Sequence, residues 1–447
     1  MPESHLSATP IDIHHKELQV DKGNPPAWLC WSVWSIAALF YLAGFYHRVS
    51  PAVMTDELMG TFHIGAAGLG NLSAFYFYFY VAMQIPTGIL VDSWGARKLL
   101  IAGSIAACAG AFLFGSTSNF ALACVGRAII GGSTAVGWLV LLKLTTHWFS
   151  AKRFAMLSGL GLLCGNIGAL TAQVPLRLAI QHVGWRPVVF VSATAVLVVG
   201  ILAFFFVKND PANDGYTTHA PAEVHRGDAS IVDLLKGFKS IFAYRNTWLI
   251  LLAQGGTVGS MIAFTGLWGA PFLKARYGLL PTQAAAVCSV MIVCWAVASP
   301  ICGGLSDRIG RRKPIYVGGY ALAAIGWAAM FYIPGLPLAA FVVLAAITSF
   351  TCGSVIIGFA LGKESVPAQF LGTISGTVNI GNMIGPMILQ PGIGWILDKH
   401  WSGAMVKGIH VYDLQAFQFG FLLIVGWLLA STVLLSFTRE SFCKHTA

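Results

Sequence analysis

Long apolar runs separated by short polar segments dominate the pattern of the chain. A helix that crosses the roughly 30 Å hydrocarbon core of a bilayer needs about 20 apolar residues, because every backbone polar group must be bonded inside its own segment. Twelve such runs can be counted, and we predict a membrane helix in each. They cover approximately residues 28–46, 69–91, 99–115, 120–142, 154–176, 187–207, 247–272, 282–305, 315–333, 338–361, 372–397 and 417–437.

The longest polar segment between runs lies at residues 208–246 and divides the runs into two groups of six. The pattern predicts an all-α membrane protein of twelve transmembrane helices in two pseudo-symmetric bundles. Its predicted parts are an N-terminal tail (1–27), a first six-helix bundle (28–207), a central loop (208–246), a second six-helix bundle (247–437) and a C-terminal tail (438–447). We interpret the central loop, with its amphipathic stretch near 231–242, as a linker in preference to a regulatory segment.

Composition agrees with a membrane protein. Hydrophobic residues make up 56% of the chain and charged residues only 10%, against roughly 25% charged residues in soluble domains. The formal net charge of +10 would suit a nucleic-acid partner, but the Lys and Arg lie mostly in short loops, and no basic helix carries interleaved aromatic residues. We therefore predict the lipid bilayer as a partner, and no nucleic acid.

The loops alternate in their content of Lys and Arg. Basic residues follow the second and eighth runs, precede the fifth and fill the central loop, whereas the loops after the third and ninth runs have none. Because basic loops stay on the cytoplasmic side, we predict a multi-pass protein of the cell inner (plasma) membrane with both termini in the cytoplasm.

The chain lacks the motifs of an enzyme or an ATP-driven pump. Its nine cysteines form no CxxC pair, and His14 and His15 have no ligand-spaced partner, so we predict no metal site. There is no G-x-x-x-x-G-K-[ST] phosphate loop, no H-E-x-x-H and no nucleophile elbow. We expect no cofactor and no enzymatic activity.

One loop motif occurs twice. The motif after the second run recurs after the eighth, each matched residue lying 215 positions further along. The first copy holds Gly88, Asp92, Gly95, Arg97 and Lys98, and the second holds Gly303, Asp307, Gly310, Arg312 and Lys313. A constant displacement of half a chain indicates an internal duplication. Glycine permits close helix packing, the Asp can bond a neighbouring helix N-terminus, and the basic residues hold the loop in water, so the motif can act as a gate latch.

This duplicated loop resembles the signature of the Major Facilitator Superfamily, G-x-x-x-D-x-x-G-x-R-K between the second and third helices with a copy in the second half. Arg127-Ala-Ile-Ile-Gly131-Gly132 is similar to the family's R-x-x-x-G-x-G signature, although Gly132 departs from its spacing. The resemblance covers about residues 28–437 and assigns Arg127 to the gating residues. It implies two bundles that rock around a central site and expose it to one side at a time, and we expect a monomer to suffice.

The first run ends in Tyr46-His47-Arg48, with Asp56 and Glu57 shortly after. Two interpretations are open: a helix end that reaches water, or a longer helix that places His47 and Arg48 near the middle of the membrane. In the second case the stretch looks like the first helix of the organic-anion branch of the superfamily, where an arginine lies at the substrate and an acid often precedes it. Arg suits a carboxylate because its planar fork donates two parallel hydrogen bonds.

Protons are the predicted coupling ion. His47 could take up a proton, since an unperturbed His has a pKa of about 6.5. Asp56 and Glu57 are the other predicted proton carriers.

Further candidates for solute contact lie on other runs. Tyr76, Tyr80 and Gln84 are spaced four apart on one helical face. The remaining candidates are Trp138, Asn166, Gln254 and Asn379, the last three chosen because the family's cavity is lined by the helices that carry them. Carboxylates are scarce near the runs, so the cavity is expected to favour an anion or zwitterion over a cation.

These features predict a secondary transporter that takes up a small carboxylate-bearing metabolite, such as an organic acid or amino acid, together with protons. The alternative is proton-driven efflux of an amphipathic compound such as a drug or siderophore, which the many aromatic residues would suit. The efflux branch of the family carries a Gly-Pro motif in its fifth helix, and the corresponding stretch here, 161–168, has no proline. Uptake is therefore favoured.

Overall fold

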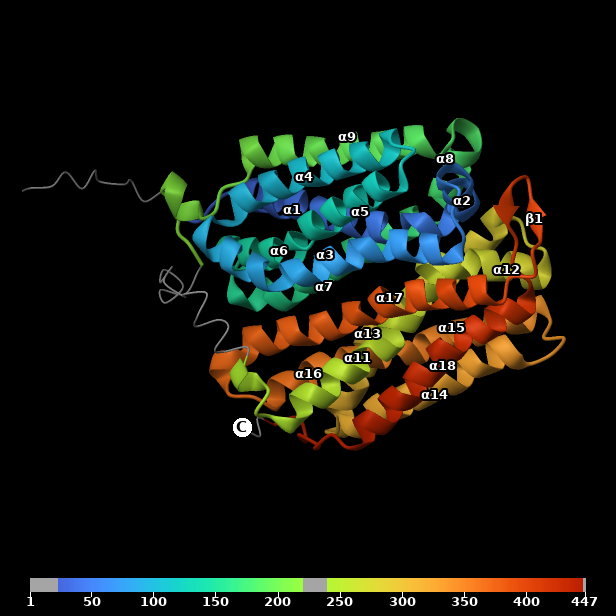
Figure 1. Cartoon of the computed structure of the whole chain (residues 1–447). Helices are drawn as coiled ribbons and strands as arrows, with labels where there is room; N and C mark the ends of the chain where they lie inside the picture. The colour runs from blue at the N-terminus through green and yellow to red at the C-terminus, as the bar shows by residue number, and fades with distance from the viewer. Residues whose placement is uncertain (1–22, 220–238, 445–447) are drawn as a thin grey trace, which may run out of the picture.

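The computed structural model describes residues 23–219 and 239–444. In this part of the chain the helices form two bundles, one from each half of the sequence, which lie one above the other in Figure 1. The first bundle contains α1 (Ala27–Val49), α2 (Thr55–Phe62), α3 (Ala66–Ser93), α4 (Ala96–Ser116), α5 (Phe120–Thr134), α6 (Val136–Trp148), α7 (Phe154–Thr171), α8 (Val174–Val183) and α9 (Trp185–Phe206). The second contains α11 (Arg245–Ala263), α12 (Gly269–Tyr277), α13 (Pro281–Ile309), α14 (Lys313–Tyr332), α15 (Leu338–Cys352), α16 (Ile356–Glu364), α17 (Leu371–Lys399) and α18 (Leu414–Ser436), with a short hairpin of β1 (Met405–Val406) and β2 (Ile409–His410).

Eleven helical spans in the described residues are long and apolar enough to cross a membrane. They match eleven of the predicted runs, so the expectation of a multi-pass helical membrane protein is confirmed. The run predicted at 372–397 forms α17, a helix of 29 residues that packs along α3 and α11. It is not among the eleven, because amides, glycines and the internal Pro386 and Pro391 make it less apolar. A total of twelve spans stays a prediction.

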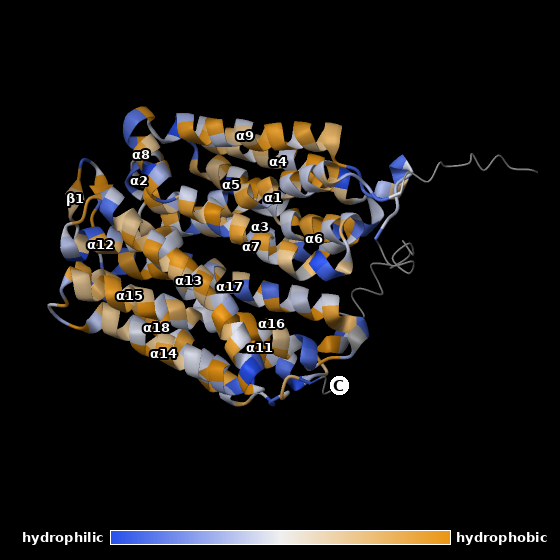
Figure 2. Ribbon diagram, turned by 180° about the vertical axis from the view of Figure 1, so that it is seen from behind, coloured by the Kyte–Doolittle hydropathy of each residue, from blue (hydrophilic) through white to orange (hydrophobic). Residues whose placement is uncertain are grey.

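Apolar side chains cover the outside of the bundles, which reverses the usual arrangement of a water-soluble protein. Figure 2 shows hydrophobic residues along the outward-facing helices and hydrophilic residues towards the two ends. On α9, for example, Val191 is 69% and Phe205 is 68% exposed. Such a surface is stable only in contact with lipid tails, as a membrane-spanning protein requires.

The two ends of the molecule differ. The described ends of the chain and the segments that lead into and out of residues 220–238 lie together at one end (Figure 1), which we call the linker end. The opposite end, here the far end, carries α2, α8, α12 and the hairpin. The amphipathic stretch predicted near 231–242 lies largely outside the described residues.

Several spans change helical geometry part of the way along. α1 ends at Val49, and a 3₁₀ turn (η1, Ser50–Val53) carries the first span on to Val53, ahead of Met54 and α2. Between α11 and α12 lies a π-helical turn (η5, Phe264–Trp268). Turns of this kind occur most often at functional sites, and here η5 packs against η1 of the other bundle.

Candidate functional site

Arg48 lies in the interior, where α1 passes into η1. Its side chain is only 4% exposed, and all four residues of η1 are buried. The guanidinium carbon lies 4.4 Å from the ring centre of Phe45 and 4.9 Å from that of Tyr80. Arg48 is thus enclosed by protein towards the end of the span that runs from Ala27 to Val53. Its depth in the membrane, on which the two interpretations of the first run differ, stays a prediction.

A second arginine, Arg127 of α5, lies beside the first. It is 1% exposed, and its Nη1 donates to the backbone carbonyl of His47 at 2.7 Å. The ring of Tyr76 is shared by the two cations, since its centre lies 5.2 Å from the guanidinium carbon of Arg127 and 5.7 Å from that of Arg48. Tyr76 is itself fixed by hydrogen bonds of its hydroxyl with Gly44 O and Thr134 Oγ1.

Within the described residues, the charge of this pair of arginines is not balanced by a carboxylate. Among the described residues, no carboxylate forms an ion pair with Arg48 or Arg127. Arg48 Nε and Arg127 Nε and Nη2 are buried without a hydrogen-bond partner in the described part of the chain. Leaving a buried charge unpaired is strongly unfavourable, and an anion bound at this cluster would compensate both guanidinium groups.

His47 adjoins both arginines. Its side chain is 4% exposed, and its Nε2 has no partner among the described residues. Tyr46 lies edge-on to its ring at 5.4 Å. Of the predicted solute-binding and proton-coupling residues, the structure thus gathers Tyr46, His47, Arg48, Tyr76 and Tyr80 at one place. It adds Arg127, which the sequence motif had assigned to gating.

The other candidates are divided between the bundle interface and positions away from the cluster. Gln84 and Asn379 meet across the interface, where the Asn379 amide donates to Gln84 Oε1 at 3.0 Å. Trp138 packs on Tyr41, one helical turn from Phe45, with ring centres 5.2 Å apart.

Asn166 and Gln254 are engaged elsewhere. The Asn166 amide donates to Leu162 O of its own helix at 3.0 Å. Gln254 is fully buried in the second bundle, where it donates to Val355 O at 3.0 Å and accepts from Tyr316. No described contact joins either residue to Arg48, and neither enters the site proposed below.

Sequence reasoning did not identify the contribution of η5. Gln173 at the start of α8 is fully buried, and its Nε2 donates across the bundles to the backbone carbonyl of Thr265 at 2.9 Å. Trp268 Nε1 donates to Gln390 O of α17 at 3.0 Å. These bonds hold the π-turn against η1 and thus close to Arg48. No sequence signal marks a π-turn inside an apolar run.

At the far end the two bundles are bonded to each other. Asp398 at the end of α17 accepts hydrogen bonds from the backbone N–H groups of Ala66 and Ala67, both at 2.9 Å, and so caps α3 of the other bundle. Tyr412 bonds both Ala66 N and the Asp398 carboxylate. Lys274 of α12 forms an ion pair with Asp56 of α2 at 2.7 Å. We call these contacts the far-end latch.

Of the predicted proton carriers, Asp56 therefore belongs to the far-end latch. Glu57 pairs with Arg177 of its own bundle at 2.6 Å. Both carboxylates are engaged in ion pairs, whereas the side chain of His47 is not.

At the linker end, the ion pairs of the duplicated motif stay within one bundle. Asp92 pairs with Lys143 of α6 at 2.8 Å, and its side chain is 62% exposed. In the second copy, Arg312 pairs with Asp307 at 2.5 Å and with Glu364 at 2.7 Å. In this conformation the ion-pair partner of Asp92 is Lys143. The kind of bond to a neighbouring helix N-terminus that the motif suggested is made instead by Asp398, at the far end.

The duplication extends to a cap that sequence reasoning missed. The backbone N–H of Arg97 donates to Asn209 Oδ1 at 2.8 Å, and those of Arg312 and Lys313 donate to Glu440 at 2.9 and 3.0 Å. Asn209 and Glu440 each follow the last helix of their own bundle. Burial alone would raise the pKa of Glu440, but the N–H groups of Arg312 and Lys313 lower it below its usual value.

Replacement of Asp398 by Asn is expected to weaken the far-end latch. The change removes a negative charge from the N-terminus of α3 and one acceptor for its N–H groups, which should shift the equilibrium by about 1–3 kcal/mol, or about 5- to 150-fold, towards a conformation open at the far end. Spin labels at His182 and Lys407, on opposite bundles at this end, would report a longer distance in a background without native cysteines.

Lys399→Gln is the matched control for this experiment. Lys399 is the next residue of α17 but lies over the ring of Trp395 and makes no described contact with the first bundle. Lys399→Gln should keep the distance distribution of the unmodified protein. If Asp398→Asn also kept it, the bonds from Asp398 to the N-terminus of α3 would not be what holds the far end closed.

The comparisons with known proteins agree on the family. The family model described as Major Facilitator Superfamily matches residues 33–269 and 255–446. A protein of Agrobacterium vitis named as a candidate tartrate transporter is 25% identical over 408 residues, which cover 83% of this chain and 84% of that protein. One of Cupriavidus necator named as a candidate sulfoacetate transporter, SauU, is 21% identical and covers 88% of this chain and 91% of its own length.

The fold is similarly shared with solved structures. A bacterial homologue of the human lysosomal transporter Spinster, solved in an inward-facing and unoccupied conformation, superposes with a TM-score of 0.72 at 16% identity. The match covers 92% of this chain and 97% of the other. At this identity the likeness concerns the fold alone.

Proposed function

Because the chain belongs to the Major Facilitator Superfamily and is a secondary transporter of a small-molecule solute, we propose that its solute is a small organic acid, bound by Arg48 and Arg127 and taken up together with protons. The observation that carries this proposal is a pair of buried guanidinium groups, neither of which forms an ion pair with a carboxylate of residues 23–219 or 239–444. Both remain charged at physiological pH, since a guanidinium group is not deprotonated in proteins.

The count of charges specifies the acid further. A solute with one carboxylate neutralises one arginine and leaves the other unpaired, whereas a solute with two anionic groups neutralises both. Leaving one buried charge without its partner costs about 2–5 kcal/mol. The solute is thus a dianion, such as a dicarboxylate or a sulfonated carboxylate. The names of the two relatives, which refer to tartrate and to sulfoacetate, support this assignment.

His47 is the proposed proton carrier. A proton on His47 adds a positive charge beside Arg127, whose Nη1 bonds the His47 carbonyl, and a bound anion offsets that charge. Binding of the anion and of the proton therefore favour each other, and this coupling is reciprocal. The Asp56 and Glu57 carboxylates would first have to leave Lys274 and Arg177.

Transport by alternating access follows from the distribution of contacts between the bundles. The far-end latch holds one end together, while the ion pairs at the linker end stay within one bundle. In this conformation the solute would exchange at the linker end, which we place in the cytoplasm because the basic loops gather there. Release of the far-end latch would expose the site to the other side.

An uptake screen in proteoliposomes tests the proposal. Tartrate, malate and sulfoacetate should be taken up with a KM about 30-fold or more below those of lactate and gluconate, because only a dianion satisfies both arginines. Uptake should be faster when the solution outside the vesicles is more acidic than the solution inside. Preference for a neutral or cationic amphipathic compound would instead favour the proton-driven efflux of a drug or siderophore, and equal uptake of mono- and dianions would contradict the charge count.

A further inference from the structure

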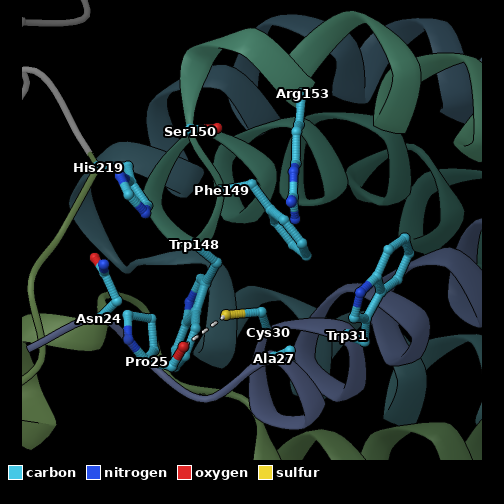
Figure 3. A pocket seen from close by; sticks show the side chains of 10 residues that line it. All are labelled: Asn24, Pro25, Ala27, Cys30, Trp31, Trp148, Phe149, Ser150, Arg153 and His219. Atoms are coloured by element: carbon cyan, nitrogen blue, oxygen red, sulfur yellow. Dashed lines mark hydrogen bonds between the residues drawn. The ribbon is translucent and has the colours of Figure 1, made fainter.

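A cavity with a volume of about 320 Å³ opens at the linker end of the first bundle. Its walls come from the start of α1, from the end of α6 with the 3₁₀ turn η2 (Ala151–Arg153), and from the segment after α9. Figure 3 shows the side chains that surround it, among them Asn24, Trp31, Trp148, Phe149, Arg153 and His219. The volume falls within the range of small-molecule sites. None of these residues belongs to the cluster around Arg48.

The wall formed by the segment after α9 is firmly held. Trp148 Nε1 donates to the carbonyl of Lys208 at 3.1 Å, and the backbone N–H of His219 donates to the carbonyl of His147 at 3.1 Å. The His147 ring bonds the Asp210 carboxylate at 2.8 Å. Burial by itself would raise the pKa of Asp210, but hydrogen bonds from Ala212 N–H and from His147 lower it, so this carboxylate is ionised at neutral pH. The cavity is therefore a built feature of the bundle.

The cavity combines a cation with an apolar wall. Arg153 extends towards the ring of Phe149 (Figure 3), and in the described part of the chain it has no ion-pair partner. Trp31 lies edge-on to Phe149 with ring centres 5.5 Å apart, and Phe149 and Trp148 are 5% and 1% exposed. None of the described residues that line the cavity carries a carboxylate. Such a site suits an anion that is attached to an uncharged, partly apolar body.

Exposed aromatic side chains beside the cavity indicate where it lies relative to the bilayer. Trp28 and Trp31 in the first turns of α1 are 65% and 38% exposed, and Phe154 at the start of α7 is 38% exposed. Outward-facing tryptophans mark the boundary between the hydrocarbon core and water. Lys152 and Arg153 are exposed at this same boundary, where anionic lipids attract basic residues.

We propose that this cavity binds the headgroup of an anionic phospholipid, with its phosphate on Arg153 and its glycerol against Trp31 and Phe149. The site is separate from the solute site and does not depend on the identity of the solute. It would tie the segment that leads to the second bundle to the lipid composition of the leaflet at the linker end.

Binding of short-chain lipids to the purified full-length protein tests the proposal. Dihexanoyl phosphatidylglycerol, kept below its micelle concentration, should bind at least about tenfold more tightly than dihexanoyl phosphatidylcholine or sodium phosphate. Arg153→Gln should weaken its binding about five- to tenfold. Lys152→Gln is the matched control, since this neighbour is equally exposed but does not line the cavity, and it should change the affinity less than twofold.

Any of the following outcomes would contradict the proposal. Equal binding of sodium phosphate would identify a site for free anions, and equal binding of phosphatidylcholine would show that the charge is not recognised. Unchanged affinity in Arg153→Gln would place the lipid elsewhere. If that variant fails to fold, Trp31→Ala serves instead: it removes the apolar wall and should weaken phosphatidylglycerol binding while leaving the weak binding of phosphate unchanged.

Discussion

Replacement of Arg48 by Ala is expected to lower uptake of an anionic solute by at least about 100-fold, because truncating one member of a buried charge pair costs about 2–5 kcal/mol. Folding should not suffer. In the described part of the chain Arg48 has no carboxylate partner, and its cation lies against the rings of Phe45, Tyr76 and Tyr80. Removing a buried charge that lacks an ionic partner is neutral or stabilising, so the melting temperature should stay equal or rise.

Initial uptake rates in proteoliposomes and thermal unfolding in detergent measure the two effects separately. Arg48→Lys keeps the charge but not the planar fork, and it should retain an intermediate rate. Arg186→Gln is a matched control, since the Arg186 guanidinium donates to the carbonyl of Thr117 outside the cluster, and its uptake rate should change little. Near-normal uptake in Arg48→Ala would rule out this arginine as the anchor of the solute.

Replacement of Gly131 by Ala is expected to destabilise the protein by about 3 kcal/mol or more. A Cβ on Gly131 would lie 2.0 Å from the carbonyl oxygen of Tyr76, since α5 touches the backbone of α3 at this point. Backbone cannot move aside as a flexible side chain can, so the two helices must separate. Their separation would also displace Arg127 from the ring of Tyr76, which lies 5.2 Å away.

The neighbouring residue provides the control. A Cβ on Gly132 would lie 3.4 Å from the side chain of Met83, an ordinary contact with a flexible neighbour, and Gly132→Ala should cost less than about 1 kcal/mol. Thermal unfolding and fluorescence-detected size exclusion of both variants measure the difference. If Gly131→Ala and Gly132→Ala had the same melting temperature, α3 and α5 would not pack as closely as described.

The site was only partly predictable from the sequence. Arg48 could be found because a charge that follows an apolar run is unusual, and Tyr76 and Tyr80 because their spacing places them on one helical face. Arg127 was recognised by its motif, but its position beside Arg48 was not. Gln254 was selected wrongly as a neighbour of this cluster. Its polarity within an apolar run suggested solute contact, but its side-chain amide is hydrogen-bonded to Tyr316 and to the carbonyl of Val355. A polar residue that bonds a neighbouring helix and one that faces a solute give the same sequence signal.

The sequence by itself determined the membrane-spanning character and the duplication, because transfer of a residue from water to lipid depends on that residue and its near neighbours, and a repeated motif can be read without knowing where its residues lie. Only the tertiary structure decided which groups meet. Asp398 and Ala66 are 332 positions apart, and nothing local to either residue specifies the other. Hydrogen bonds and ion pairs act over a few ångströms, so helix packing determines which end of the molecule is latched and which cations share a ring.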